Sequence, residues 1–309
     1  MKQIEVEMSG GVPAELAVDR AGSRARLSDY LALTKPRLNF LVVATAAAGY
    51  YLGAADRFDM FTALNLVAGT ALVAGGSSVF NQVYERDTDA LMRRTWTRPL
   101  PEGRLQPTEA LLFGGVLSTA GLLLLALGTT LLAAAIALVT LLTYTVIYTP
   151  MKRRSSLATL VGAIPGALPP MLGWAAGRDN LSIHAWTLFS IVFLWQLPHF
   201  LAIAWMYRED FARAGFPLLP VIEPDGRSTG RQAVLYAAAL IPVSLIPWII
   251  GLAGATYFAV ALLLGSALLV LAARFALTRT LASARRLFFG SITYLPLLWT
   301  LMILNRVKL

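Results

Sequence analysis

Long uncharged stretches recur along the chain, separated by short polar intervals, and several reach the roughly 20 residues that a helix needs to cross a bilayer. Two of them are far longer, so each must hold two helices with a turn between them. In order, the stretches are Leu38–Ala55, Met60–Phe80, Ala110–Met151 with a turn near Gly128–Thr130, Ser155–Gly177, Ala185–Tyr207, Gln232–Ala273 with a turn near Gly251–Gly254, and Leu287–Leu304. This pattern predicts an all-α integral membrane protein with about nine transmembrane helices.

The composition agrees with this prediction, and the distribution of charge predicts the orientation of the chain in the membrane. Of the 309 residues, 57% are hydrophobic and 14% are charged, which is far more apolar than a soluble domain. Twenty-two of the 26 Lys and Arg residues fall in the amino-terminal segment and in alternate connections, at 81–108, 150–156, 207–231 and 274–286. Because Lys and Arg are enriched in cytoplasmic loops, we predict a multi-pass protein of the cell inner (plasma) membrane with a cytoplasmic amino terminus. The net charge of +9 then reflects topology, and no binding of nucleic acid is expected.

The first 30 residues contain acidic side chains and no apolar core. They therefore match neither a secretory signal peptide nor an acid-poor transit peptide, and we expect a disordered cytoplasmic leader at 1–30. The remainder, 31–309, is expected to form a single transmembrane domain. The chain has no cysteine, which excludes disulfides and thiolate metal ligands.

Three oxygen-bearing side chains, Asn81, Glu85 and Asp89, follow directly after the second uncharged stretch at four-residue spacing. On a helix each four-residue step rises about 6 Å and turns about 40°, so these side chains would line one groove. Mg²⁺ prefers such oxygen ligands and usually takes one or two carboxylates together with waters and substrate phosphates. Asp87 lies off this stripe and is expected to pair with a nearby arginine or to meet water. A solvated helix end whose acids pair with neighbouring arginines is the alternative interpretation.

Basic side chains crowd the same predicted membrane face. They are Arg93, Arg94 and Arg98 after the stripe, Lys35 and Arg37 before the first stretch, and Lys152, Arg153 and Arg154 after the fourth span. Cytoplasmic topology and contact with anionic lipid explain the sign of these charges. They do not explain why acids in metal-ligand spacing lie among them. The two sets together suit a metal-bound diphosphate, because metal would neutralise its charge and Lys and Arg would stabilise it as it leaves.

The sixth span holds an ionisable residue within an otherwise apolar helix, in the sequence Trp195–Phe200. An ionisable side chain inside a span is a candidate functional residue. His199 could serve as an axial haem ligand, as an acid or base, or only as a hydrogen-bonded packing residue. After this span, Asp210 could complete the metal site from the second half of the chain, or it could form a salt bridge at the start of the loop.

These residues resemble the motifs of the UbiA superfamily of intramembrane prenyltransferases and, within it, the protohaem IX farnesyltransferase branch. The matching segments, in order, are Leu33–Arg37; Asn81, Glu85, Asp89, Met92, Arg94, Thr95 and Arg98–Leu100; Tyr148–Arg153; Gly162, Gly166, Ala167, Pro169, Pro170, Gly173 and Trp174; Trp195, Gln196 and Pro198–Phe200; and Asp210, Phe211, Gly215, Leu219 and Pro220. Two positions depart from the wider superfamily. The middle acid of the first motif is Glu85 rather than aspartate, and the residue four after Asp210 is Ala214 rather than a second aspartate. The second departure fits the haem-modifying branch better than the branches that modify quinone precursors.

The resemblance implies a UbiA-type helical bundle that transfers a farnesyl group from farnesyl diphosphate to a vinyl group of haem B. Water adds as well, which gives haem O. The implied site residues are Asn81, Glu85, Asp89 and Asp210 for Mg²⁺; Lys35, Arg37, Arg94, Arg98, Lys152 and Arg153 for the diphosphate; Trp195, Gln196 and His199 for haem; and Asn81, Glu85, Asp89 and His199 for catalysis. The implied partners are the lipid bilayer, the two substrates, and a downstream haem A synthase or terminal oxidase assembly factors.

Two other functions are compatible with parts of the pattern. One is a UbiA-type prenyltransferase that acts on an aromatic quinone precursor such as 4-hydroxybenzoate. The other is a transporter, which would share the many spans. A transporter should show polar or broken helices near mid-membrane in both halves, whereas the charges here gather at one face.

Overall fold

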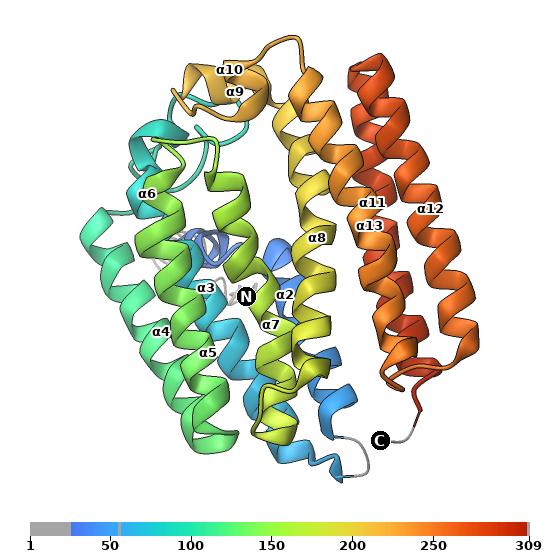
Figure 1. The fold of residues 1–309 in the computed structure, drawn as a ribbon. Helices are drawn as coiled ribbons and strands as arrows, with labels where there is room; N and C mark the ends of the chain where they lie inside the picture. The colour runs from blue at the N-terminus through green and yellow to red at the C-terminus, as the bar shows by residue number, and fades with distance from the viewer. Residues whose placement is uncertain (1–25, 55–56, 308–309) are drawn as a thin grey trace, which may run out of the picture.

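The computed structural model describes residues 26–54 and 57–307, and there the chain is a bundle of long helices (Figure 1). In chain order the elements are α2 (Pro36–Ala54), α3 (Met60–Asp89), α4 (Pro107–Gly128), α5 (Leu131–Leu142), the π-helical turn η2 (Thr143–Tyr148), α6 (Thr149–Met151), α7 (Ala158–Arg178), α8 (Ile183–Met206), α9 (Arg208–Arg213), α10 (Leu219–Ile222), α11 (Arg227–Ile249), α12 (Ala255–Thr278) and α13 (Leu281–Leu304). The all-α prediction is confirmed.

Eight helices of the described part of the chain are long and apolar enough to cross a membrane, counting α5, η2 and α6 as one helix. The one predicted span outside these eight is the first along the chain, which corresponds to α2 and has 19 residues. Its first turn contains Pro36, Arg37 and Asn39, and it is not among the eight helices that are long and apolar enough to cross a membrane. The turns predicted near Gly128–Thr130 and Gly251–Gly254 are confirmed by the ends of α4, α5, α11 and α12.

The central helices of the bundle are α7 and α8, the most buried of the eight. On one side α2 packs against α7, and on the other side α11 and α13 pack against α8. The two central helices therefore join an amino-terminal group of helices to a carboxyl-terminal group (Figure 1). This arrangement brings α8 and α13, which are far apart in sequence, into direct contact.

The contact between α2 and α7 depends on glycine, because the two backbones almost touch. A Cβ atom added at Gly173 would lie 1.9 Å from the carbonyl oxygen of Ala46, and one added at Gly49 would lie 2.1 Å from that of Pro170. Small residues commonly allow such close approach between helices in membranes. The position of α2, and of the residues just before it, is therefore set by this glycine contact.

Replacing Gly173 by alanine is expected to destabilise the protein by about 2 kcal/mol, as overpacking of a tight core does. The midpoint of thermal unfolding in detergent measures this effect. Gly115→Ala on α4 is the matched control, because nothing lies within 4 Å of the Cβ atom that it adds. Equal midpoints for the two variants would contradict the close approach of α2 and α7.

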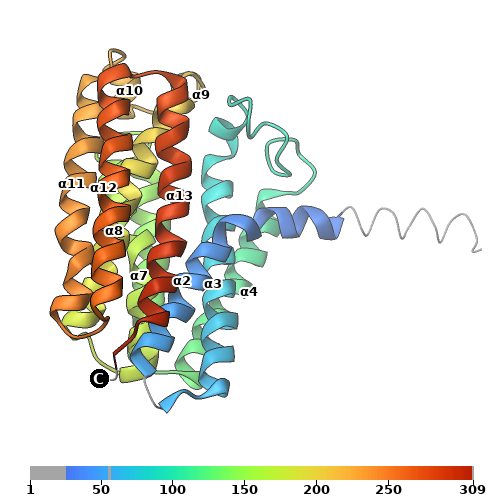
Figure 2. The same ribbon diagram turned by 90° about the vertical axis from the view of Figure 1, so that its right-hand side faces the viewer.

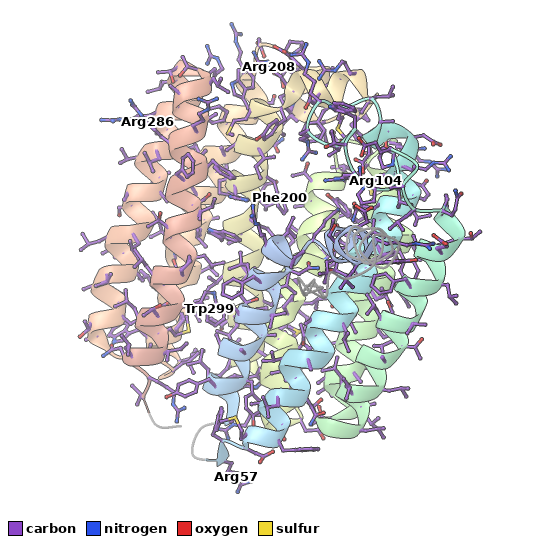
Figure 3. All side chains as sticks on the ribbon, turned by 180° about the vertical axis from the view of Figure 1, so that it is seen from behind. Arg57, Arg104, Phe200, Arg208, Arg286 and Trp299 are labelled. Atoms are coloured by element: carbon purple, nitrogen blue, oxygen red, sulfur yellow. The ribbon has the colours of Figure 1, made fainter. Side chains whose placement is uncertain are left out.

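The connections at 90–106 and 152–157 and the short helices α9 and α10 gather at one end of the bundle, which we call the basic end (Figure 1). Met92 of the 90–106 connection packs with Phe211 of α9 and with Phe216, which follows α9. The 90–106 connection and the segment that contains α9 therefore share one apolar cluster. Figure 3 shows Arg208 and Arg286 toward this end of the molecule and Arg57 at the opposite end.

Residues 26–33 form a helix that lies across the direction of the long helices (Figure 2). Two ion pairs hold it: Arg104 contacts Asp29 at 3.0 Å, and Arg26 contacts Glu109 at 2.6 Å. The helix is thereby tied to the 90–106 connection and to α4. The leader predicted at 1–30 lies mostly outside the described residues.

Candidate active site

The polar stripe predicted after the second span is the last part of α3. This helix begins at the cap residue Asp59, whose side chain accepts a hydrogen bond from the amide of Thr62. It continues past Phe80 to Asp89, nine residues beyond the predicted span. Asn81, Glu85 and Asp89 are only 2%, 3% and 1% exposed. The helix end is therefore not solvated, although Asp89 does pair with an arginine, as the alternative interpretation expected. Burial also means that their polar atoms need partners within the protein.

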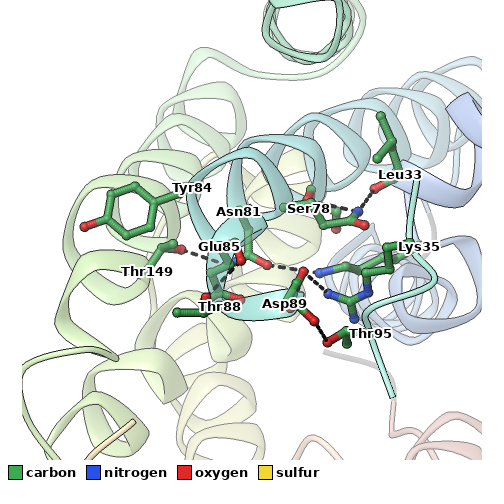
Figure 4. A network of polar contacts seen from close by, with 12 residues as sticks. Leu33, Lys35, Ser78, Asn81, Tyr84, Glu85, Thr88, Asp89, Thr95 and Thr149 are labelled. Carbon is green, nitrogen blue, oxygen red and sulfur yellow. Dashed lines mark hydrogen bonds and ion pairs between the residues drawn. The ribbon is translucent and has the colours of Figure 1, made fainter. Parts of the chain in front are cut away.

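Each member of the stripe meets a basic side chain from a different segment. Figure 4 shows the three stripe residues on α3 with Lys35 beside them. The Lys35 Nζ donates to Asn81 Oδ1 at 3.0 Å. The Lys152 Nζ donates to Glu85 Oε1 at 2.7 Å, and Arg98 Nη1 donates to Asp89 Oδ2 at 2.6 Å. The structure therefore brings together six of the predicted site residues, three of them acidic or amide and three of them basic.

Local contacts hold two of the three basic side chains, Lys35 and Arg98, in place. Lys35 has a left-handed backbone conformation with φ of 47° between the 26–33 helix and α2. The side-chain amide of Gln82 fixes this turn by donating to the carbonyl of Leu33 at 2.6 Å. The Thr95 hydroxyl donates to the backbone carbonyl of Asp89 at 2.8 Å, and this bond folds the connection back so that Arg98 reaches the stripe. A left-handed conformation is costly for a residue with a side chain, and such strain clusters at functional sites.

Burial and neighbouring charges shift the pKa values of the basic groups. Burial, and next to it the positive charge of Arg98, lowers the pKa of Lys35 to about 7. Burial alone would also lower the pKa of Lys152, but the carboxylate of Glu85 together with Tyr148 and Tyr144 outweighs it and raises that pKa above its ordinary value. An excess of positive charge in a buried space is the condition under which an anion would bind.

The remaining predicted diphosphate residues lie at the margin of this cluster. The guanidinium of Arg94 lies over the rings of Tyr207 and Phe211, at 5.4 and 5.1 Å, and burial lowers its pKa. Arg153 lies over the ring of Tyr84 at 5.3 Å and is 3.4 Å from the hydroxyl of Thr88. Arg37 is exposed at the start of α2.

The two acids outside the stripe pair with their own neighbours. Asp87 pairs with Arg86 at 2.9 Å with 77% of its side chain exposed, as predicted. Asp210 is buried and paired with Arg213 on α9. Within residues 26–54 and 57–307, no group of three His, Cys, Asp or Glu side chains is arranged to hold a metal ion. The structure therefore does not bring Asp210 together with Glu85 and Asp89.

One oxygen atom of the stripe has a free lone pair. Asp89 Oδ1 is buried and has no hydrogen-bond partner among the residues that the structure describes. A buried carboxylate oxygen without a donor is energetically unfavourable unless a cation meets it. The amide oxygen of Asn81 and the carboxylate of Glu85 lie on the same helix face as Asp89. Together these oxygens form the hard donor set that Mg²⁺ prefers. These residues fit a divalent metal centred on Asp89.

A second polar cluster joins α8 to α13 and α7. Trp195 Nε1 donates to the backbone carbonyl of Ser291 at 2.7 Å, and His199 Nδ1 lies 2.8 Å from the hydroxyl oxygen of the same serine. Gln196 Nε2 donates to the carbonyl of Ala163 at 2.8 Å. The predicted haem residues are therefore held by α13 and α7. Ser291 could not be found from the sequence, since a serine in an apolar span carries no spacing pattern.

The fold and these contacts define a class: a multi-pass membrane protein with buried acids and cations at one end of a helical bundle. The chain belongs to the UbiA prenyltransferase family, whose model matches residues 42–295. It is 49% identical to the protoheme IX farnesyltransferase of Solibacter usitatus over 91% of this chain and 99% of that protein. It is 44% identical to the protoheme IX farnesyltransferase of Koribacter versatilis over 96% and 98% of the two chains.

The fold is also that of a solved member of the family. The structure of a UbiA homologue from Archaeoglobus fulgidus bound to GPP and Mg²⁺ matches 89% of this chain and 99% of its own, with a TM-score of 0.65 and 17% sequence identity. The predicted UbiA-type helical bundle is thereby confirmed.

Proposed function

We propose that this protein transfers a farnesyl group from farnesyl diphosphate to a vinyl group of haem B, with addition of water, and releases haem O and diphosphate. The observation that carries the proposal is the buried stripe of Asn81, Glu85 and Asp89, each paired with a cation from a different segment. Relatives named protoheme IX farnesyltransferase, matched over almost the whole chain, support haem as the acceptor.

The diphosphate would bind among the cations that surround the stripe. Lys35, Arg98 and Lys152 would donate to its oxygens, and Arg94 and Arg153 would close the margin of the site. Charge-assisted hydrogen bonds of this kind are stronger than neutral ones. They strengthen as negative charge grows on the leaving group, so they stabilise the transition state more than the substrate. Arg37, which is exposed, contributes to binding only by its charge.

A divalent metal is part of this proposal. Asp89 would be its main protein ligand, with Asn81 and Glu85 on the same helix face, whereas Asp210 would act only from a distance because it pairs with Arg213. When bound, Mg²⁺ neutralises the diphosphate and withdraws charge from the breaking carbon–oxygen bond. The solved homologue bound to GPP and Mg²⁺ supports this part of the proposal.

The chemical step would then run as follows. The bond between the farnesyl C1 and the diphosphate oxygen breaks, and the electron pair leaves with the diphosphate. The π electrons of the haem vinyl group form a bond to C1, which leaves a positive charge on the vinyl carbon next to the porphyrin. Water adds to that carbon and loses a proton. Trp195, Gln196 and His199 would contact the porphyrin, and the apolar walls of the bundle keep bulk water from the allylic cation.

The location follows from the distribution of charge. The chain is a multi-pass membrane protein, and the basic end carries the site. Under the positive-inside rule this end faces the cytoplasm, so we propose an inner-membrane enzyme whose amino terminus and active site are cytoplasmic. Haem O would leave toward a haem A synthase or a terminal oxidase in the same membrane.

The test is a reaction of the purified, detergent-solubilised protein with haem B, farnesyl diphosphate and Mg²⁺. A haem product whose mass equals that of haem B plus one farnesyl group and one hydroxyl group, formed only when all three are present, would support the proposal. A parallel reaction replaces haem B with 4-hydroxybenzoate. Prenylation of that phenol without any haem product would overturn the assignment in favour of a quinone-precursor prenyltransferase.

A further inference from the structure

Ser291 on α13 holds two of the proposed haem residues at once. It is completely buried, and its carbonyl accepts from Trp195 Nε1 while its hydroxyl oxygen lies 2.8 Å from His199 Nδ1. Trp195 and His199 are four residues apart on α8, so they share one face of that helix. The imidazole ring stacks against both Trp195 and Phe288, with ring centres at 5.3 and 5.0 Å. The plane of the ring is therefore set by α13 as much as by α8.

The hydroxyl of Ser291 also decides where the imidazole proton resides. The hydroxyl has one proton, and Ser291 Oγ lies 2.7 Å from the backbone carbonyl oxygen of Phe288, to which it donates. If the hydroxyl proton pointed to His199 instead, two oxygen atoms would face each other at 2.7 Å with no proton between them. The favourable arrangement is a relay in which Nδ1–H donates to Ser291 and Ser291 donates to Phe288. The neutral ring then carries no proton on Nε2.

The nitrogen left without a proton is the one that remains free. Among the described residues the one hydrogen bond of the His199 ring is the one at Nδ1, and the ring is only partly buried. An unprotonated imidazole nitrogen is a ligand for a metal ion or an acceptor for a proton. Hydrogen bonding at one ring nitrogen determines the tautomer and the direction of the other.

We infer that Ser291 is a positioning residue that holds His199 as the Nδ1–H tautomer and presents Nε2 to the haem substrate. The part that concerns haem rests on the proposed function, whereas the tautomer does not. Ser291→Ala removes the acceptor of the imidazole proton. Ser291→Thr keeps a hydroxyl that can still donate to its own helix backbone, so it is expected to restore the wild-type behaviour.

The tautomer can be read directly, because the chain has only two histidines. Full-length protein labelled with ¹⁵N-histidine in nanodiscs, with His184→Gln to leave one signal, should show a protonated Nδ1 and an unprotonated Nε2. If that variant does not fold, the signals of the unsubstituted protein can be assigned by difference with His199→Gln. Ser291→Ala should give a mixture of tautomers, and Ser291→Thr should not. A wild-type spectrum with the proton on Nε2, or an Ala variant with an unchanged tautomer, would overturn the inference.

The role of Ser291 in the use of haem is measured by steady-state kinetics. Loss of a group that orients a liganding histidine typically costs 10-fold or more in affinity or activity, so Ser291→Ala should raise the KM for haem B about 10-fold. The KM for farnesyl diphosphate should not change, and Ser291→Thr should recover the wild-type value. Thr293→Val on the same helix is the matched control, because that hydroxyl bonds only to the carbonyl of Phe289.

The two possible failures are distinguishable. A changed tautomer with an unchanged KM for haem B would overturn the role of Ser291 toward the substrate while leaving the proposed function intact. A wild-type protein that forms no farnesylated haem would overturn the proposed function, and the tautomer experiment would still decide the contact between Ser291 and His199.

Discussion

Asp89→Asn is expected to lower the rate of haem farnesylation at least about 100-fold, which corresponds to roughly 3 kcal/mol of lost transition-state stabilisation. The change removes one negative charge and one of the two carboxylate oxygens, but keeps a carbonyl that can accept from Arg98 at the present 2.6 Å contact. Metal-ion stabilisation of a leaving group is worth several kcal/mol. The rate of haem O formation, measured over a titration of Mg²⁺, should show a weakened dependence on the metal together with the lower maximum.

The control for this prediction lies two residues away on the same helix. Asp87→Asn removes a carboxylate that is 77% exposed and pairs only with Arg86, so its rate should stay within a few-fold of the wild type. Thermal unfolding shows whether each variant is folded. A folded Asp89→Asn protein as active as Asp87→Asn would remove Asp89 from the metal site.

Lys152→Met is expected to destabilise the protein by about 3 kcal/mol, because it leaves the carboxylate of Glu85 buried without its partner. The pair is 2.7 Å long, and the two side chains are only 16% and 4% exposed. Part of the lost interaction is offset by Lys35, whose charge also acts on Glu85. The midpoint of unfolding in detergent measures the loss of stability, and the KM for farnesyl diphosphate measures the loss of a diphosphate ligand.

The double variant Lys152→Met, Glu85→Gln separates these two effects. Removing both charges takes away the unpaired carboxylate, so much of the lost stability should return. Activity should remain low, because the cation that would meet the diphosphate and the carboxylate of Glu85 in the metal site are both missing. A double variant with normal KM and turnover would show that Lys152 serves only to neutralise Glu85.

The arrangement of α3 illustrates what could be predicted from the chain alone. Apolar stretches of the length of a bilayer predicted every long helix, and the turns inside the two double-length stretches were located within a few residues. The four-residue spacing of Asn81, Glu85 and Asp89 predicted a common face, since helix periodicity is a local property. The exposure of Asp87 followed from the same geometry.

The pairing within the site could not be predicted in this way. Lys35 meets Asn81 across 46 residues, Lys152 meets Glu85 across 67, and Ser291 meets His199 across 92. Asp210, predicted as a metal ligand, pairs with Arg213 instead of reaching the stripe. The charge pattern predicts that the cations lie on one face of the membrane, but it does not predict which cation lies next to which acid.

By itself the sequence determined the all-helical membrane fold, the common end for its basic residues and the polar face of α3, because these depend on apolar length, charge and helix periodicity. The tertiary structure decided which cations enter the site, left Arg37 exposed and brought Ser291 of α13 to His199. These contacts depend on the rotation and depth at which the helices pack. The close approach of α2 to α7 at Gly49 and Gly173 is one such contact, and it forms only when the two helices are packed together.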